Sequence, residues 1–237
     1  MQPFAPAPCS QCAHRADSVC NAIAPEDLDL LARIAGTARA GAGESIIPEG
    51  APAAYFFNLT EGHARLFKSM PDGRRQITGF AGPGDFLGLA ASSRYAFGAE
   101  AIDAVQFCRF PRAALETLCR DRPALGERLL GVAAHELAAA QAQMLLLGRK
   151  TAEERIASFL IRCANDGRPC GHLAADVTLA MSRTDIADYL GLTIETVSRT
   201  LTKLRRQGLI DLPEIQRIVL TDGPALMRLA TGRTERH

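Results

Sequence analysis

The chain has 237 residues, enough for about two domains, and 47% of them are hydrophobic, which is sufficient for packed cores. Lys and Arg number 27 against 26 Asp and Glu, so the formal net charge is +1 and a basic surface can only be local. No secretory signal opens the sequence and charges interrupt its apolar runs, so we expect a cytoplasmic protein with reduced thiols and no membrane partner.

Three of the seven cysteines crowd together near the start, at Cys9, Cys12 and Cys20. In a reducing compartment this favours metal or redox chemistry over disulfides, and a short segment rich in Pro and Ala offers its cysteines little burial. Zinc and iron–sulfur sites usually take four ligands, and the spacing alone does not separate them. The fourth ligand must come from Cys108, Cys119, Cys163, Cys170 or His14.

A dithiol redox enzyme using Cys9 and Cys12 is a more distant alternative. Such pairs normally follow a strand and stand at the start of a helix, and nothing strand-like precedes Cys9. No other catalytic arrangement stands out, so the sequence predicts that the protein is not an enzyme.

From about residue 38 to residue 111, short alternating runs predict β-strands. Gly- and Pro-containing turn signals separate them, at residues 48–50, 61–62, 71–73 and 82–85. Many short strands at near-regular spacing favour an antiparallel sandwich or barrel. The runs are Glu44–Ile47, Tyr55–Leu59, His63–Lys68, Gln76–Phe80 and Val105–Phe110.

A helix follows, with Pro123 before it and Gly148 after it. Its apolar residues recur at alternating intervals of three and four, as in the seam of a short coiled coil. We expect this seam to form a homodimer interface; the alternative is that it packs on the β domain. The seam residues are Leu130, Ala133, Leu137, Ala140, Met144 and Leu147.

Residues 183–199 predict two short helices joined by a tight turn, the pattern of a helix-turn-helix. Gly191 stands where a positive φ is needed, and Thr193 can cap the second helix. On that helix Glu195, Ser198 and Arg199 share one face. A solvated amphipathic helix in some other helical domain is the alternative.

The chemistry of that face suits the major groove of double-stranded DNA. Arg199 can donate twice to guanine, Glu195 can accept from cytosine, and Ser198 can pair with several base edges. Lys203, Arg205 and Arg206 would meet phosphates. Two alternating runs around Pro213 and Glu214 predict a β-hairpin, or wing, after the second helix.

With this order of elements the chain resembles the cAMP receptor/FNR superfamily of transcription regulators, and within it the FNR-type oxygen sensors. The resemblance runs from Cys9 to about Ala230 and is most specific at residues 76–80 with 83–85, 150–155 and 189–199. The family's Glu-x-x-Ser-Arg recognition signature falls on Glu195, Ser198 and Arg199. It implies half-sites containing TTGAT.

The resemblance implies an α+β fold: an N-terminal antiparallel β-roll of the cyclic-nucleotide-binding type, a long dimerisation helix and a C-terminal winged helix-turn-helix. We place a cluster-binding segment at 1–24, the β-roll at 25–122, the helix at 123–148 and the DNA-binding domain at 149–237. FNR-like proteins hold an oxygen-labile [4Fe–4S] cluster, whose ligands match Cys9, Cys12, Cys20 and Cys108. The other cysteines are then ordinary residues.

The implied function is control by oxygen: cluster assembly favours the dimer, and the dimer binds DNA at genes of anaerobic metabolism. RNA polymerase is a further expected partner, through residues 76–85. Cyclic nucleotide is not expected, because Leu89 follows Gly88 where the family has Glu, and no cation stands in residues 97–101 where the phosphate would lie. A zinc-stabilised or thiol-switched regulator is the alternative.

Overall fold

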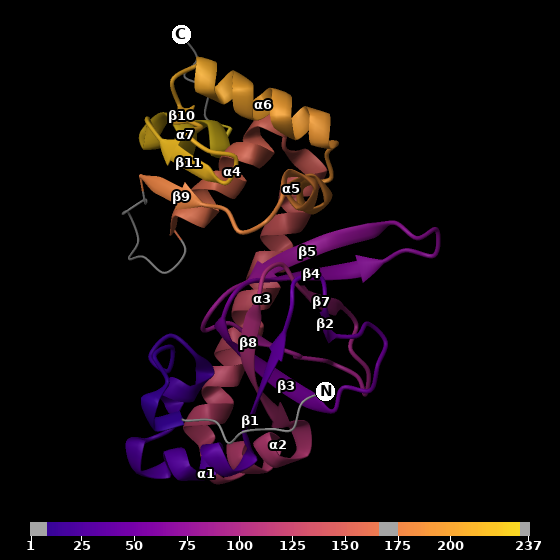
Figure 1. Cartoon of the computed structure of the whole chain (residues 1–237), viewed down its shortest axis with the longest axis vertical. Coiled ribbons are helices and arrows are strands. Elements are labelled where there is room, and N and C mark those ends of the chain that lie inside the picture. Colours follow the sequence, from indigo (N-terminus) through magenta and orange to yellow (C-terminus); the bar gives the residue numbers. More distant parts are fainter. Residues whose placement is uncertain (1–8, 166–174, 233–237) are drawn as a thin grey trace. The chain divides into compact units, whose positions relative to one another are not determined.

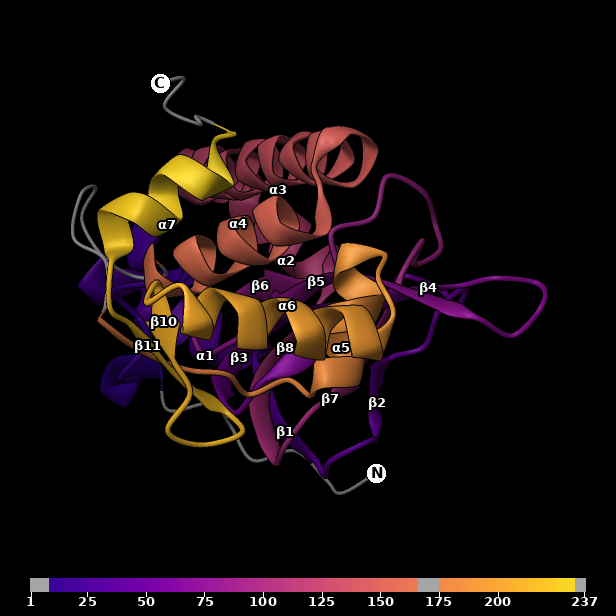
Figure 2. The ribbon, with the colours of Figure 1, turned by 90° about the horizontal axis from the view of Figure 1, so that it is seen from above.

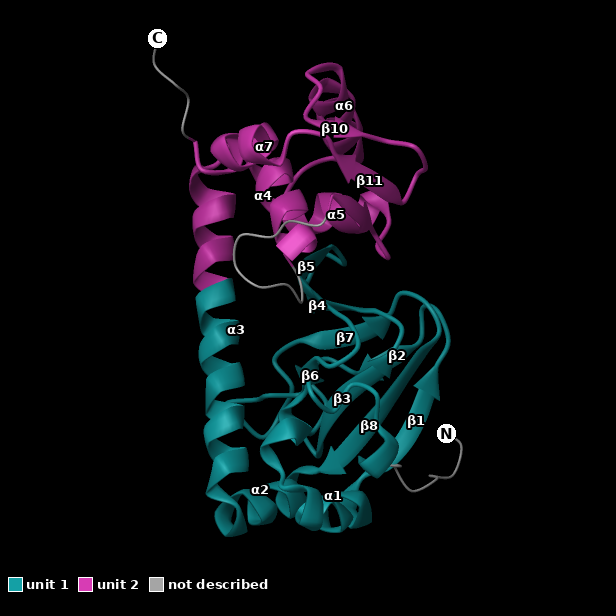
Figure 3. Cartoon of the chain, turned by 90° about the vertical axis from the view of Figure 1, so that its left-hand side faces the viewer, with its two compact units in different colours: residues 1–139 teal, residues 140–237 magenta. Residues whose placement is uncertain are grey.

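The computed structural model describes residues 9–165 and 175–232, so the predictions made for Cys170 lie outside the described residues. The chain divides into two compact units, residues 1–139 and 140–237, coloured separately in Figure 3. One long helix, α3 (Pro123–Arg149), begins in the first unit and ends in the second.

The first unit joins short helices to two antiparallel sheets (Figure 1). The strand orders are β1-β8-β3-β6 and β2-β7-β4-β5. The helical elements are η1 (Cys9–Gln11), η2 (Val19–Ala22), η3 (Pro25–Asp27), α1 (Leu28–Ile34) and α2 (Arg112–Asp121). The strands are β1 (Gly36–Ala40), β2 (Ser45–Ile47), β3 (Tyr55–Glu61), β4 (Ala64–Ser69), β5 (Arg75–Ala81), β6 (Phe86–Leu87), β7 (Gly98–Ala101) and β8 (Val105–Pro111).

Strand β3 shows how the sequence divides its side chains between two cores. Phe57 and Leu59 join a cluster drawn from both sheets, whereas Phe56 belongs to a second cluster with helical residues. Because successive side chains on a strand point to opposite faces, the first sheet separates the two clusters. The second cluster contains Phe86, Phe110, Leu31 and Leu115, among others.

The five predicted strands are confirmed as β2, β3, β4, β5 and β8, and the antiparallel arrangement is also confirmed. Strands β1, β6 and β7 were not predicted. β1 and β7 consist largely of Ala and Gly, and β6 has only two residues, so none shows the β-branched alternation that marks a strand in sequence.

Two predicted turns allow a matched test of backbone strain. Gly62 and Gly73 both have a positive φ, of 74° and 86°. A methyl group at Gly62 would lie 2.3 Å from the carbonyl oxygen of Ala104, whereas one at Gly73 would meet nothing within 4 Å. We expect Gly73→Ala to lower the free energy of unfolding by about 1 kcal/mol, through φ alone. Gly62→Ala adds the clash and should lower it by about 3 kcal/mol. Equal losses in urea unfolding would contradict the close approach.

The long helix α3 corrects two sequence predictions. Gly148 does not end it, because the helix continues to Arg149. By length and composition alone α3 could also cross a membrane, since its charges lie mostly near its ends; only 6% of its most apolar window is buried. We predicted no stretch of this kind. A single such helix is weak support for a membrane span, and the exposed apolar residues fit the predicted dimer seam equally well.

The second unit consists of the end of α3, further helices and a small sheet of order β10-β11-β9. The helices are α4 (Ala152–Asn165), α5 (Arg183–Leu190), α6 (Ile194–Arg206) and α7 (Gly223–Ala230). The strands are β9 (Asp176–Thr178), β10 (Ile210–Asp211) and β11 (Arg217–Leu220). The predicted hairpin is therefore confirmed, with β9 as an additional, unpredicted strand.

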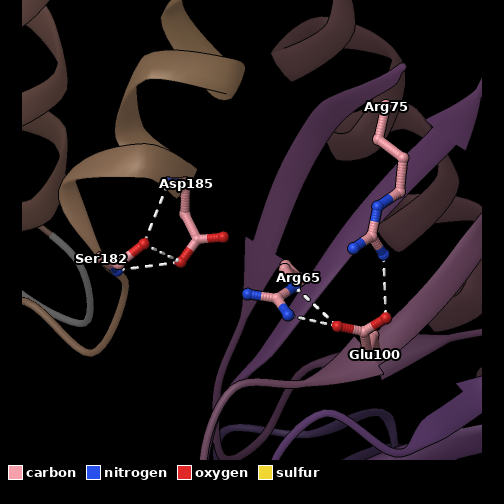
Figure 4. Close-up of polar contacts among 5 residues, drawn as sticks. All are labelled: Arg65, Arg75, Glu100, Ser182 and Asp185. Carbon is pink, nitrogen blue, oxygen red and sulfur yellow. Dashed lines mark hydrogen bonds and ion pairs between the residues drawn. The ribbon is translucent and has the colours of Figure 1, made fainter. Parts of the chain in front are cut away.

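A capping box begins α5. The Ser182 hydroxyl accepts a hydrogen bond from the backbone N–H of Asp185, and the Asp185 carboxylate accepts one from the backbone N–H of Ser182 (Figure 4). This reciprocal pair satisfies donors that the first turn of a helix leaves without partners. It fixes where the helix-turn-helix starts.

Candidate DNA interface and cysteine site

The predicted helix-turn-helix is formed by α5 and α6. Gly191, between them, has φ 61° and ψ 43°, the left-handed conformation expected at the end of a helix. The Thr193 hydroxyl caps α6 by accepting from the backbone N–H of Thr196, as predicted. Figure 2 shows α6 beside α5, with the hairpin of β10 and β11 near its other end.

The predicted base-reading residues lie on the exposed side of α6. Glu195, Ser198 and Arg199 are exposed, while Val197, Leu201 and Leu204 are buried against the unit's core. An open hollow runs along this side, lined by Ser198, Arg199, Thr200, Thr202, Lys203 and Arg206. Hydroxyl and cationic side chains therefore share one surface, which suits base edges together with phosphates.

Glu195 is placed to remain ionised. Its own backbone N–H, then the Thr193 hydroxyl and the Arg199 charge, lower the pKa of its exposed carboxyl. An ionised carboxylate is an acceptor only, which matches the cytosine amino group.

The Glu195→Ala variant should therefore relax selection at one base pair of each half-site. We expect discrimination there to fall by about 1–3 kcal/mol, while the salt dependence of binding stays unchanged. Titrating operators that carry each base pair in turn, at two salt concentrations, measures both effects. Glu127→Ala, which removes an exposed carboxylate of the first unit, is the charge-matched control. An unchanged base preference would contradict this role.

Two of the predicted phosphate contacts have partners within the chain. The Lys203 ammonium is paired with Glu153, and Arg205 lies 3.4 Å from the Asp211 carboxylate. These pairs hold the cations at the surface of the unit, and both are exposed enough to be exchanged for phosphate. The sequence did not reveal either pair, because the partners come from α4 and β10.

The wing carries an exposed tip. Ile215 is 81% exposed, and its carbonyl oxygen accepts a hydrogen bond of 2.9 Å from Arg183, at the start of α5. The hairpin is thus tied to the helix-turn-helix that it follows in sequence.

The predicted cysteine ligands come from separate segments that pack on the second core cluster. Cys9 and Cys20 lie in η1 and η2, and Cys108 lies in β8; all three are half-buried against that cluster. Val19 and Ile23, beside Cys20, are buried in it. The expectation that these cysteines gain little burial is therefore wrong for Cys9 and Cys20, because their segment packs into the apolar core of the first unit.

The four thiols are close enough to influence one another. Burial, followed in order by the neighbouring thiols of Cys9, Cys20 and Cys12, raises the pKa of Cys108 to about 12. Burial raises the pKa of Cys9 to about 11, with Cys20 and Cys12 as the next causes. Burial also raises the pKa of Cys20, although a hydrogen bond with the Ser18 hydroxyl lowers it in part. Four such thiolates would need a cationic partner to stay deprotonated together.

Arg15 braces the loop between Cys12 and Cys20. Its guanidinium donates a 2.6 Å hydrogen bond to the carbonyl oxygen of Ile23, and its charge favours the thiolate of Cys20. The Arg15 side chain is half-buried.

Among the described residues, no three or more His, Cys, Asp or Glu side chains are arranged as a metal site. The chemistry of the predicted donors fits an iron–sulfur cluster, since cysteine thiols are the usual ligands of such clusters. Cys119, in α2, packs on the same cluster, and Cys163, in α4, is half-buried.

The predicted dimer seam is largely uncovered. Leu130, Leu137 and Met144 are 71%, 61% and 71% exposed, and Ala140 is exposed as well. Ala133 and Leu147 are half-buried. α3 packs on the first unit through another stripe, formed by Leu125, Leu129 and Val132. The alternative that the seam itself covers the β domain is therefore wrong for Leu130 and Leu137 of the first unit, which remain available to another chain.

The second sheet of the first unit holds an internal ion-pair network. Glu100 in β7 accepts hydrogen bonds from Arg65 in β4 and from Arg75 in β5, the latter at 2.9 Å (Figure 4). Burial of the Glu100 carboxyl raises its pKa, but the two guanidiniums outweigh this effect and the pKa is lowered. The network links β4, β5 and β7 within the first unit.

Two family models match the chain: a Cyclic nucleotide-binding domain over residues 38–122 and a Crp-like helix-turn-helix domain over residues 154–229. The transcriptional activatory protein AadR of Rhodopseudomonas palustris is 46% identical over 201 residues, 85% of this chain and 84% of that protein. The transcriptional activator protein FnrL of Cereibacter sphaeroides is 36% identical over 228 residues, 94% of this chain and 91% of FnrL.

Among solved structures, that of FixK2 from Bradyrhizobium japonicum superposes with a TM-score of 0.77 at 38% identity. The match covers 83% of this chain and 97% of FixK2.

Proposed function

The chain belongs to the Crp/FNR family of DNA-binding transcription regulators, and from that premise we propose that it is an oxygen-responsive, dimeric activator. Its relatives are transcriptional activators of the FNR/FixK type, not enzymes. The observation that supports an oxygen response is the proximity of four thiols: Cys9, Cys12 and Cys20 of the N-terminal segment lie near Cys108 of β8.

These four residues would hold a [4Fe–4S] cluster. When bound, the cluster supplies oxygen-labile links between the N-terminal segment and β8. The packing of the first unit connects this segment to α3. Val19 and Ile23 of the segment share one core cluster with three residues of α3, Leu125, Leu129 and Val132. Docking of the segment therefore supports the face of α3 next to the exposed seam.

We propose that the seam, with Leu130, Leu137 and Met144, pairs with the same seam of a second copy. The dimer seam and the cysteine segment lie on different sides of α3. Docking of the segment can shift the monomer–dimer equilibrium only to the extent that it stabilises the dimer more than the monomer. A dimer reads two half-sites together and binds far more tightly than one subunit.

In each half-site, which we take to contain TTGAT, Arg199 is assigned to guanine and Glu195 to the cytosine of the opposite strand. Activation further requires RNA polymerase, which we assign to β5 and the turn after it, residues 76–85. We expect the protein to act in the cytoplasm, where the DNA and a reducing medium are both present.

The test is anaerobic purification, followed by assay of iron and sulfide, a visible spectrum and operator binding as air is admitted. Brown protein with about four irons and four sulfides per chain, losing colour and DNA affinity together in air, is the expected result. Colourless protein containing zinc, binding DNA equally with and without air, would contradict the oxygen response. It would favour a zinc-stabilised or thiol-switched regulator on the same fold.

A further inference from the structure

Asn58 is a polar residue in the middle of an apolar face. It lies in β3, is only 2% exposed, and shares its side of the first sheet with Phe56, two residues away. Its partners across the two neighbouring ladders are Phe86 in β6 and Cys108 in β8. Residues directly opposite on antiparallel strands place their Cβ atoms about 4.5–5.5 Å apart and on the same face. Asn58 is therefore a direct neighbour of the expected cluster ligand Cys108.

The hydrogen-bonding capacity of Asn58 is not met within the described part of the chain. The Nδ2 amide donates to the carbonyl oxygen of Leu59 at 3.3 Å, and Oδ1 has no partner. A carboxamide has two N–H donors, so one further donor also remains. Buried polar groups are normally satisfied, and an unsatisfied one destabilises the fold. A leucine would therefore be more stable than Asn58 beside Phe56 and Phe86, unless a polar group binds next to this position.

The cysteine segment reaches the same place. The Gly84 N–H donates a 2.9 Å hydrogen bond to the carbonyl oxygen of Leu59, the residue after Asn58. A methyl group at Gly84 would lie 3.4 Å from Cβ of Asp17, which stands between Cys12 and Cys20. Asn58 is thus bordered by Cys108 on one strand and, through this turn, by the loop that carries the other cysteines.

We propose that Asn58 is a positioning residue for the cluster: its free amide N–H donates to the Cys108 thiolate or to a sulfide beside it. This rests on the proposed function, because only a bound cluster brings anionic sulfur to this face. Hydrogen bonds from N–H groups to the sulfurs raise the stability of the reduced cluster and are among the features that set its potential. Asn58 would then slow the loss of the cluster in air.

The first experiment compares Asn58→Leu with Phe56→Leu, both reconstituted anaerobically. Asn58→Leu removes the donor, and we expect the half-life of the visible absorption in air to fall about 10-fold. Its Fe–S(Cys) stretching bands in resonance Raman spectra should move to higher frequency, because the thiolate no longer accepts a hydrogen bond. Phe56→Leu alters the same face of the same strand without touching a donor, so it should lower the melting temperature of the cluster-free protein and leave the half-life unchanged.

A second pair keeps the test sharp if Asn58→Leu does not fold. Asn58→Thr and Asn58→Val have nearly the same shape and differ by one hydroxyl donor, so the Thr variant should hold its cluster longer in air. Equal half-lives in this pair would overturn the inference. So would an Asn58→Leu protein with wild-type half-life and Raman bands, or a Phe56→Leu protein that loses its cluster as fast. In all these cases a brown, air-sensitive wild type leaves the proposed function intact; a wild type without iron and sulfide overturns both.

Discussion

Cys108→Ala is expected to give a colourless protein whose DNA binding no longer depends on oxygen. Cys108 is the only expected ligand outside the N-terminal segment, so its loss removes the link between that segment and β8. With the dimer no longer favoured, anaerobic affinity for a palindromic operator should fall about 100-fold. Iron and sulfide analysis and fluorescence anisotropy with labelled operator, both without air, measure the two effects.

The matched control is Cys119→Ala. Cys119 is half-buried against the same core cluster, and burial raises the pKa of its thiol as it does that of Cys108. The two substitutions remove the same atom from similar surroundings, so their effects on the stability of the cluster-free chain should be similar. Only Cys108→Ala should abolish colour. A Cys108→Ala protein that binds its operator only without air would show that the ligands are assigned wrongly.

The sequence predicts the DNA-binding half of the molecule well because its signals are local. Gly191 and Thr193 mark the turn within a few residues of the helices that they join, and both take the predicted roles. The apolar side of α6 likewise follows from helical spacing. The partners of Lys203 and Arg205 were missed because Glu153 and Asp211 lie on other elements, and sequence spacing carries no information on such pairs.

The cysteine site shows the opposite case. Clustering in the sequence pointed to Cys9, Cys12 and Cys20, and the family resemblance added Cys108. The packing of the cysteine segment on the core was not predicted. That docking depends on how Val19 and Ile23 meet Phe86 and Phe110, which are far away in sequence. The position of Asn58 beside Cys108 depends on the register of β3 with β8, across 50 residues of chain, and no local pattern encodes that register.

One arginine joins three chain segments within the second unit. Arg155 Nε donates to the carbonyl oxygen of Lys150 at 2.9 Å, and its two Nη atoms donate at 2.8 Å to those of Leu147 and Leu190. Leu147 belongs to the last turn of α3, and Leu190 is the last residue of α5. The last carbonyls of a helix have no partner within it, so one planar guanidinium satisfies the ends of two helices at once.

We expect Arg155→Ala to lower the free energy of unfolding by about 3 kcal/mol, because it removes three hydrogen bonds from a charged donor and leaves half-buried carbonyls without partners. Arg155→Lys retains the charge but not the planar, forked guanidinium. Its free energy of unfolding should lie between those of Arg155→Ala and the wild type. Arg149→Ala removes an exposed arginine from the end of α3 and should change little. Urea unfolding of the four proteins separates charge from geometry. If Arg155→Ala stays within about 0.5 kcal/mol of wild type, the junction of α3 and α5 is held mainly by the paired hydrogen bonds of Gln143 with Tyr189.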